Sequence, residues 1–333
     1  MNAKVLEVRD LEVTIETPAG VLTAIDRASF DLRKGEILGL VGESGSGKTL
    51  TGRAIMRLLP SKKMAIRSGT IHVNGEDITR YDESRMRGVR GRIIGMIFQN
   101  PSSHLDPVMT VGKQIAESIK FHEGLSSKAS LLRAAELLRQ VDIPDPHIRL
   151  NSFSHEFSGG MRQRAMIAMA LACRPKILIA DEPTTALDVT VQAQILNLLL
   201  DLRQRRGLSI MLVTHDLGVV AQTCDTIAVM YAGRLVERAT KKDLLSGPLH
   251  PYTKGLIASQ PGKTQPRQQL PSISGQPPAL ASFPEGCRFH PRCEFSEAEC
   301  QAAVPALEQA DRDHYTACRR WHSLVQQKVL GAA

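Results

Sequence analysis

Short apolar runs recur along the chain and predict buried β-strands. Such runs extend from Ile37 to Val41, from Ile177 to Ala180 and from Ile210 to Val213, and they are rich in branched aliphatic residues. Uninterrupted apolar runs of this length are typical of parallel strands that are buried on both faces. The chain is therefore predicted to have an α/β fold.

Two other patterns predict a half-exposed strand and two helical segments. Residues Leu11 to Ile15 alternate between apolar and polar, as in a strand with one exposed face. Helical spacing of three and four residues runs through Leu50 to Leu59 and through Val111 to Val141. The second segment is predicted to stop before Pro144 and Pro146, because proline does not continue a helix.

Length and turn signals divide the chain into a large domain and an appendage. With 333 residues, 42% of them hydrophobic, the chain exceeds one typical domain and can fill a packed core. Tyr231 to Glu237 is typical of a hairpin near the end of the large domain, and Gln260 to Pro284 has the Pro, Gln and Ser content of a linker. The expected domains are residues 1–259 and 260–333.

The net charge of +8 admits nucleotides, anionic lipid surfaces and nucleic acids as partners without choosing among them. Aromatic residues make up 4% of the chain, too few for a surface that stacks single-stranded bases. The longest apolar stretch, Ala165 to Cys173, is half of the roughly 18 residues that a membrane span needs. Because charged residues interrupt the first ten positions, neither a secretory signal nor a membrane span is expected.

A glycine-rich segment after the first apolar run fits the phosphate-loop pattern G-x-x-x-x-G-K-[ST]. Its glycines let successive backbone N–H groups turn toward a phosphate chain, and the following helix adds its positive end. Lys48 supplies a mobile charge, and the Thr49 hydroxyl is a ligand for Mg²⁺. A chance glycine-rich turn would lack this lysine and threonine. The predicted nucleotide-binding residues are Gly42, Glu43, Ser44, Gly45, Ser46, Gly47, Lys48 and Thr49.

Two acids, Asp181 and Glu182, follow the second apolar run. They stand at the carboxyl end of a predicted parallel strand, where open α/β sheets place their ligands. Mg²⁺ is the natural partner for Asp181. Glu182 points to the other side of the strand and can act as general base toward water. The alternative is a pair of solvated acids that open a turn before Pro183.

In this order the motifs resemble those of the nucleotide-binding subunits of ATP-binding-cassette (ABC) transporters, over most of the chain. The phosphate loop is similar to the Walker A motif of that family, and the strand ending in Asp181 and Glu182 is similar to its Walker B motif. Four further segments resemble, in turn, the Q-loop, the signature motif, the D-loop and the switch histidine: Gln99, Ser158-Gly159-Gly160, Ala186-Leu187-Asp188 and His215.

The resemblance implies a P-loop NTPase of ABC type, with a RecA-like core, an antiparallel β subdomain and a helical subdomain at about residues 101–165. It also implies that two subunits pair head to tail, so that each ATP lies between the Walker A loop of one and the signature motif of the other. Ser158, Gly159 and Gly160 would then contact the nucleotide of the partner, with the helix that begins near Met161 directing its positive end there.

The resemblance assigns roles to two residues that would otherwise pass as a solvated glutamine and a core histidine. Gln99 would contact Mg²⁺ together with Thr49 and Asp181. Gln99 and His215 would also place the water that Glu182 activates. Ile15 stands where the family often has an aromatic residue that stacks on adenine, and this difference would weaken adenine binding by on the order of 1 kcal/mol.

Four of the chain's six cysteines cluster after the predicted linker: Cys287, Cys293, Cys300 and Cys318. The open alternatives are structural zinc, an iron–sulfur cluster, disulfides and unligated thiols. Disulfides are disfavoured in a cytosolic ATPase, because the cytosol keeps thiols reduced. Intervals of 5, 6 and 17 residues are wide for a zinc knuckle. A [4Fe–4S] cluster tolerates wider spacing. Cys173 and Cys224 lie in apolar segments and are expected to pack.

Several segments sharpen the resemblance to the dipeptide/oligopeptide branch of ABC importers. They are Phe98 to Pro101, Asp106 to Gly112, Gly159 to Arg164, His250 to Thr253 and Gly286 to Cys293. Some members of this branch carry a [4Fe–4S] cluster on four such cysteines, so the resemblance ranks the cluster ahead of zinc, with unligated thiols third. His290 and His314 are expected at the surface rather than as ligands.

The resulting hypothesis is an ATP-hydrolysing subunit that powers a membrane importer for di- or oligopeptides or a related small solute. Its expected partners are two transmembrane permease subunits, a second, homologous ATPase and, indirectly, an extracytoplasmic solute-binding protein. The chain would then lie peripherally on the cytoplasmic face of the inner membrane.

The alternative from another class is an ABC ATPase that acts on nucleic acid in repair or translation. Translation members usually carry two cassettes and repair members insert long coiled coils, and this sequence has neither pattern. Nucleic acid is therefore not expected as a partner. A binding subunit without enzyme activity is disfavoured because Glu182 and His215 are both present.

Overall fold

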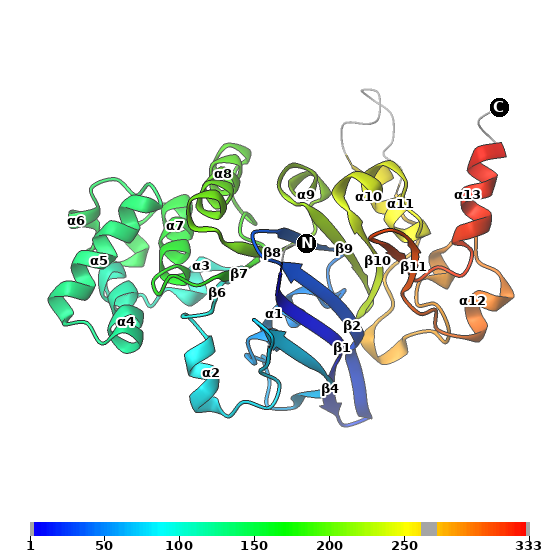
Figure 1. Ribbon diagram of the computed structural model, residues 1–333, viewed down its shortest axis with the longest axis horizontal. Helices are drawn as coiled ribbons and strands as arrows, with labels where there is room; N and C mark the ends of the chain where they lie inside the picture. The colour runs from blue at the N-terminus through cyan, green and yellow to red at the C-terminus, as the bar shows by residue number, and fades with distance from the viewer. Residues whose placement is uncertain (1–2, 261–271, 331–333) are drawn as a thin grey trace. The chain divides into compact units, whose positions relative to one another are not determined.

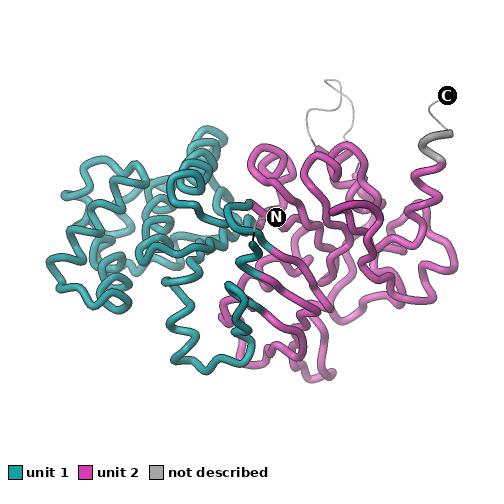
Figure 2. Tube along the Cα trace, viewed as in Figure 1, with its two compact units in different colours: residues 1–6, 32–36, 72–212 teal, residues 7–31, 37–71, 213–333 magenta. Residues whose placement is uncertain are grey.

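The computed structural model describes residues 3–260 and 272–330. Its contacts divide the chain into two compact units, which Figure 2 colours separately. Unit 1 comprises residues 1–6, 32–36 and 72–212, and unit 2 comprises residues 7–31, 37–71 and 213–333. The described residues contain no helix that is long and apolar enough to cross a membrane.

Unit 2 contains five neighbouring strands in the order β11-β12-β10-β9-β3. The strands β3 and β9 pair in parallel, with Val41 opposite Val229. The hairpin predicted near Tyr231 joins β9 to β10, which pair antiparallel. The five strands are β3 (Ile37–Val41), β9 (Thr226–Tyr231), β10 (Arg234–Thr240), β11 (Glu308–Asp311) and β12 (His314–Thr316).

The segment that carries the four clustered cysteines also contributes to this sheet. Its strand β12 pairs antiparallel with β10, with Thr316 opposite Glu237, and β11 follows at the edge. Beyond the end of β12, the backbone N–H of Ala317 donates a hydrogen bond to the carbonyl oxygen of Val236 at 2.8 Å. The C-terminal segment is therefore joined to the core of unit 2 by main-chain hydrogen bonds.

A second sheet places β1 (Lys4–Thr17) between β2 (Gly20–Arg33) and β4 (Met64–Val73), and most of these three strands lies in unit 2. The alternation predicted from Leu11 to Ile15 lies within β1, where Leu11 and Val13 are buried and Ile15 is half-buried. The short β5 (Glu76–Asp77) adds to the end of β4, with His72 opposite Asp77.

Several helices of unit 2 begin at a side chain that accepts from one of their first N–H groups. The Asp216 carboxylate accepts from Gly218 at the start of α9, and the His250 ring accepts from Tyr252 at the start of α11, which has Pro251 at its first position. The regular helices are α1 (Lys48–Ile55), α9 (Leu217–Thr223), α10 (Lys241–Ser246), α11 (Pro251–Ala258), α12 (Ala298–Ala302) and α13 (Trp321–Leu330), and the 3₁₀ turns are η2 (Leu280–Ser282) and η3 (His290–Arg292).

Unit 1 contains the strands β6 (Ile94–Ile97), β7 (Ile177–Asp181) and most of β8 (Ser209–Thr214) in the order β8-β7-β6. The strands β6 and β7 are parallel, with Ile94 opposite Ile177. Both are buried along their whole length, as the apolar run from Ile177 predicted. The predicted strand at Ile210 lies within β8.

The helices of unit 1 include a small group in which α4, α5, α6 and α7 pack together, as Figure 1 shows. The single helical segment predicted from Val111 to Val141 is two helices, α4 and α5. Gly124 ends α4 in a left-handed conformation with φ 69°, and Ser126 caps α5. The bounds are α2 (Glu83–Val89), α3 (Pro101–His104), α4 (Val111–Glu123), α5 (Ser127–Gln140), α6 (Pro146–Arg149), η1 (Ser154–Glu156), α7 (Gly159–Ala170) and α8 (Val189–Arg206).

The contact between β6 and the end of α7 depends on a glycine and leads to a testable expectation. A Cβ at Gly95 would lie 2.3 Å from the backbone oxygen of Ala170, so Gly95→Ala should destabilise unit 1 by about 2 kcal/mol. A Cβ at Gly88 in α2 would meet open space among the described residues, so Gly88→Ala should be neutral or stabilising by up to about 1 kcal/mol. The midpoint of thermal unfolding should fall in Gly95→Ala and should not fall in Gly88→Ala, and equal shifts in the two variants would contradict this packing.

Candidate active site

The phosphate loop of unit 2 runs from the end of β3 to the start of α1. Gly42, Gly45 and Gly47 have φ angles of 154°, 77° and 105°, a region that side chains disfavour. A Cβ at Gly42 would lie 2.0 Å from the backbone oxygen of Met230, at the end of β9. The glycine at position 42 is therefore required both by its conformation and by the strand beside it.

Lys48 is buried under the loop that precedes it, with 5% of the residue exposed. Its ammonium donates to the carbonyl oxygens of Gly42 and Glu43, each at 2.8 Å, and lies 3.4 Å from the Ser46 hydroxyl. The backbone N–H of Gly233 in turn donates to the carbonyl of Ser46 at 2.9 Å. The charge that sequence analysis assigned to a phosphate is thus held at the centre of the loop.

The start of α1 faces the same loop. Its N-cap is Gly47, and a glycine has no side chain with which to satisfy the first N–H groups of the helix. Thr49 lies in the first turn, directly after Lys48. A helix N-terminus of this kind, next to a loop that concentrates backbone N–H groups and an ammonium, favours phosphate oxygens.

The Glu43 side chain has a partner far along the sequence, also in unit 2. Its carboxylate accepts two bonds from the Arg292 guanidinium, at 2.7 Å and 3.0 Å. Its backbone N–H donates to the Tyr252 hydroxyl at 2.8 Å. The motif had marked Glu43 as nucleotide-binding without anticipating either contact, because both partners are more than 200 residues away in sequence.

In unit 1 the structure brings together Gln99 and Glu182. The Gln99 side-chain amide donates to Oε2 of Glu182 at 2.8 Å, and the Thr185 hydroxyl donates to the same oxygen at 2.8 Å. Glu182 has a φ of 46°, and the preceding Asp181 is fully buried at the end of β7. Thr185 was missed by sequence analysis, since a threonine three residues past an acid carries no distinctive pattern.

The signature residues lie at the start of α7, which begins at Gly159 rather than near Met161. The exposed Ser158 is the N-cap, and its hydroxyl accepts from the backbone N–H of Met161 at 3.2 Å. A Cβ at Gly160 would lie 2.9 Å from the Val191 side chain, so α7 approaches α8 closely at this point. Asp188, the last D-loop residue, caps α8.

His215 follows β8 and is exposed, and Ile15 in β1 is half-buried. The predicted residues thus fall into two groups. The loop from Gly42 to Thr49, Ile15 and His215 lie in unit 2, whereas Gln99, Asp181, Glu182 and the signature motif lie in unit 1. Within these groups the structure joins Gln99 to Glu182, and the roles assigned to Gln99, His215 and Glu182 remain predictions.

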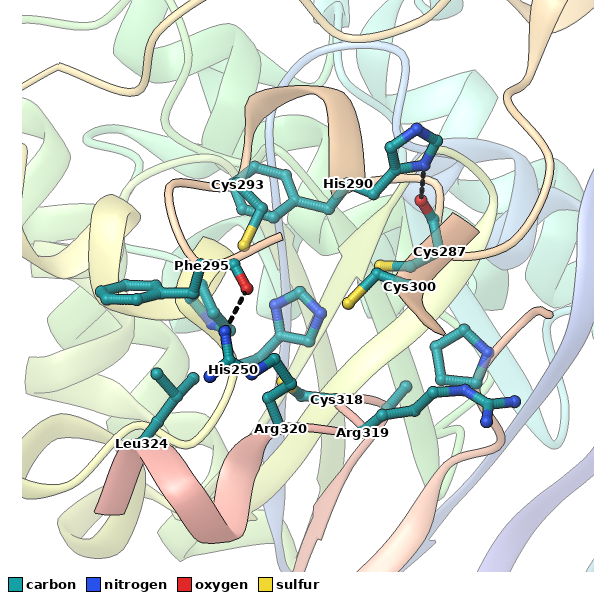
Figure 3. A pocket seen from close by; sticks show the side chains of 14 residues that line it. His250, Cys287, His290, Cys293, Phe295, Cys300, Cys318, Arg319, Arg320 and Leu324 are labelled. Atoms are coloured by element: carbon teal, nitrogen blue, oxygen red, sulfur yellow. Dashed lines mark hydrogen bonds between the residues drawn. The ribbon is translucent and has the colours of Figure 1, made fainter. Parts of the chain in front are cut away.

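The four clustered cysteines line one small cavity of about 20 Å³, together with His250 and Phe289. Figure 3 shows the sulfur atoms of Cys287, Cys293 and Cys300 directed toward this shared space. Burial raises the pKa of Cys293 to about 11 and that of Cys318 to about 12, and the neighbouring thiols add to both shifts. In residues 3–260 and 272–330, groups of three or more His, Cys, Asp or Glu arranged to hold a metal ion are absent.

The other two cysteines pack as expected. Cys224 is buried at the end of α9, and burial raises the pKa of Cys173 to about 11.

The expectation that His314 lies at the surface is wrong. Its side chain is 7% exposed, and its Nε2 lies 2.7 Å from Oε1 of the fully buried Glu237. The Glu237 carboxylate also accepts from the backbone N–H groups of Leu249 and His250. The pairing of β12 with β10 places the histidine against this acid. His290 is half-buried, with Nδ1 3.0 Å from the Cys287 carbonyl.

A strand, a glycine-rich loop, a buried lysine and a helix N-terminus in this arrangement define a P-loop nucleotide-binding protein. Comparison with known families narrows this class. The sequence profile of the family described as "ABC transporter" matches residues 25–185, and that of "Oligopeptide/dipeptide transporter, C-terminal region" matches residues 236–300.

Relatives cover nearly the whole chain. It is 47% identical over 327 residues to the dipeptide transport ATP-binding protein DppD of Bacillus subtilis (strain 168), covering 98% of both chains. It is 49% identical over 313 residues to the oligopeptide transport ATP-binding protein OppD of the same organism, covering 94% of this chain and 87% of that one. The chain therefore belongs to the ATP-binding subunits of ABC transporters.

Solved structures agree with this assignment. The ATP-binding cassette MJ0796, in a dimeric post-hydrolysis state bound to ADP and Pi, superposes with a TM-score of 0.64 at 26% identity. The similarity covers 71% of this chain and 98% of that cassette. The expected ABC ATPase fold is confirmed, and the chain is an ATPase of this family.

Two glycines of the phosphate loop allow its geometry to be tested by nucleotide affinity. Gly42→Ala adds a clash with Met230 to the cost of a positive φ, so the Kd for Mg-ATP should rise about a hundredfold. In Gly45→Ala the added Cβ would have no described atom within 4 Å, so only the free-energy cost of the positive φ remains. The Kd of this variant for Mg-ATP should rise about fivefold. Titration with a fluorescent ATP analogue measures both, and similar losses in the two variants would argue against the close approach of Gly42 to Met230.

Proposed function

We propose that this chain is the ATPase subunit that powers import of di- or oligopeptides, or of a related small solute, through an ABC transporter. One observation carries the proposal: the region from 236 to 300 matches the C-terminal region of oligopeptide/dipeptide transporters in the same chain as an ABC cassette. Relatives named for dipeptide and oligopeptide transport support it along almost the full length. We assign the cassette to residues 1–259 and the extension to residues 260–333.

The proposed ATP site is shared by two subunits. ATP lies on the loop from Gly42 to Thr49 of one subunit and under Ser158, Gly159 and Gly160 of the other. The exposed position of Ser158 at the start of α7 supports this, as does the first turn Gly-Gly-Met-Arg, which is free of acidic residues and suits a phosphate. The dimeric state of the similar cassette MJ0796 points the same way.

Within that site Glu182 is the general base. It accepts a proton from the water that attacks the γ-phosphate, while Gln99 and Thr185 fix the orientation of its carboxylate. His215 places the same water. Thr49, Gln99 and Asp181 offer a hydroxyl, an amide and a carboxylate oxygen, the donors that Mg²⁺ prefers, and the ion neutralises phosphate charge when bound.

The proposed assembly follows from this role. The chain docks on two transmembrane permease subunits at the cytoplasmic face of the inner membrane, beside a second, homologous ATPase. An extracytoplasmic solute-binding protein delivers the solute and acts on this chain only through the permeases. The family assignment gives no support to an ABC ATPase that acts on nucleic acid.

For the four-cysteine site we propose a [4Fe–4S] cluster. The four thiols line one cavity although up to 31 positions separate them, and burial raises the pKa of Cys287, Cys293 and Cys318, which opposes bare thiolates at these three positions. Iron would stabilise the thiolate forms. The intervals of 5, 6 and 17 residues between the cysteines are wide for a zinc knuckle, which places zinc second.

A transport assay tests the ATPase mechanism and the solute together. Vesicles would contain the chain with its co-purified permeases and partner ATPase, with ATP inside and the solute-binding protein and a labelled dipeptide or tripeptide outside. Glu182→Gln should lower the hydrolysis rate and uptake at least about a hundredfold, with nucleotide affinity little changed, since only proton acceptance is lost. Glu308→Gln, an exposed carboxylate in β11, is the matched control.

The outcomes separate the two parts of the proposal. Native rates of hydrolysis by Glu182→Gln would remove the general base from the mechanism. ATP-dependent uptake of a sugar or a metal chelate in place of peptides would correct the solute and leave the ATPase role standing.

The metal site has a separate test. Chain purified without oxygen should be brown and contain about four iron and four acid-labile sulfide per molecule. Cys293→Ser should lower both contents, whereas Cys173→Ser, whose thiol lies beside the Ser118 carbonyl in unit 1, should leave them unchanged. A colourless protein with stoichiometric zinc would assign the site to zinc instead.

A further inference from the structure

We propose that Arg292, in the C-terminal extension, is a positioning residue for ATP binding. It acts by anchoring and neutralising Glu43, the first variable residue of the phosphate loop. The inference rests on the ATPase function proposed above and concerns a contact within unit 2.

The contact itself is a paired one. The two terminal nitrogens of Arg292 donate to the two carboxylate oxygens of Glu43, Nη1 to Oε2 at 2.7 Å and Nη2 to Oε1 at 3.0 Å. The Arg292 side chain is 5% exposed and that of Glu43 is 28% exposed. Two parallel charge-assisted hydrogen bonds in a largely dry setting fix both distance and orientation.

The Arg292 guanidinium also has contacts with residues outside the phosphate loop. Its Nε donates to the Ser274 carbonyl at 2.9 Å, and Nη1 lies 3.4 Å from the Tyr231 hydroxyl. The guanidinium carbon lies 5.8 Å and 5.9 Å from the ring centres of Tyr231 and Phe289. Because a backbone carbonyl and two rings restrain it, the guanidinium can act as a fixed point for Glu43.

Glu43 is in turn hydrogen-bonded to other residues of the loop. Its N–H is held by the Tyr252 hydroxyl from α11, and its carbonyl accepts from the Lys48 ammonium and from the N–H of Ser46. One residue therefore connects the extension to the lysine that is expected to meet the phosphates.

The sign of the effect follows from charge. The phosphate loop must bind a polyanion, and a bare carboxylate within it would repel that ligand. Arg292 supplies the compensating positive charge from outside the motif. Without Arg292, the loop would carry an extra negative charge at Glu43 as well as greater freedom, and both changes oppose ATP binding.

The closing experiment measures the affinity of the full-length chain for a fluorescent ATP analogue with Mg²⁺. Arg292→Ala should raise Kd about tenfold, which corresponds to about 1.4 kcal/mol. Arg292→Lys keeps the charge and loses the paired hydrogen bonds, so its Kd should lie between those of the wild-type chain and Arg292→Ala. The double variant Glu43→Gln with Arg292→Ala should return to within about threefold of the wild-type Kd, because it removes the uncompensated carboxylate.

That rescue separates the proposed role from a purely structural one. If Arg292 served only to fold the extension, the double variant would bind as weakly as Arg292→Ala, and the proposal would fall. It would also fall if Arg292→Ala, shown by thermal unfolding to be folded, bound with wild-type affinity. In the assembled transporter Arg292→Ala should raise KM for ATP with little change in kcat.

Two controls complete the design. Arg312→Ala removes one exposed positive charge from the turn between β11 and β12 and should leave Kd unchanged. A similar loss there would mean that net charge, and not the pair with Glu43, controls affinity. Failure of the wild-type chain to bind ATP would instead overturn the ATPase function and this inference with it.

Discussion

The architecture of this subunit depends on one close approach of backbone to backbone. Gly42 leaves β3 so near the end of β9 that a single methyl group would collide with the Met230 carbonyl. The parallel pairing of β3 with β9 fixes that distance, and the loop, the buried lysine and the start of α1 follow from it. Phosphate recognition is thus mainly a property of the main chain, which explains why the motif tolerates variable residues between its glycines.

A second constraint operates at the end of β7. Glu182 has a left-handed backbone conformation, which costs a residue with a side chain on the order of 1–2 kcal/mol. Hydrogen bonds from Gln99 and Thr185 then restrict its carboxylate. Strain of this kind persists where the surrounding structure enforces it, and it is concentrated at functional sites. Ten other non-glycine residues among those described also have a positive φ, so at Glu182 it is the combination with these two hydrogen bonds that supports the proposed role as general base.

Much of the fold could be predicted from sequence because its signals are local. Apolar runs located β3, β7 and β8, because a strand buried on both faces needs apolar residues at every position. The glycine-lysine-threonine pattern located the loop, because a positive φ favours glycine. The break at Gly124 was missed because the spacing seen in α5 was extended back to Val111, although the buried positions are interrupted between Ile119 in α4 and Ser130 in α5. The pairs of Glu43 with Arg292 and of Glu237 with His314 lay beyond sequence reasoning, because each joins distant segments through tertiary packing.

The turn η3 links two regions that differ in chemistry. Its hydrogen bonds run from His290 to the Cys287 carbonyl and from Cys293 to the His290 carbonyl, so it holds two of the cysteines while presenting Arg292 to the phosphate loop. Coupling free energies are reciprocal. Through the pair of Arg292 and Glu43, nucleotide binding would stabilise this turn, and a rearrangement of the segment from Cys287 to Cys293 would in return weaken nucleotide binding.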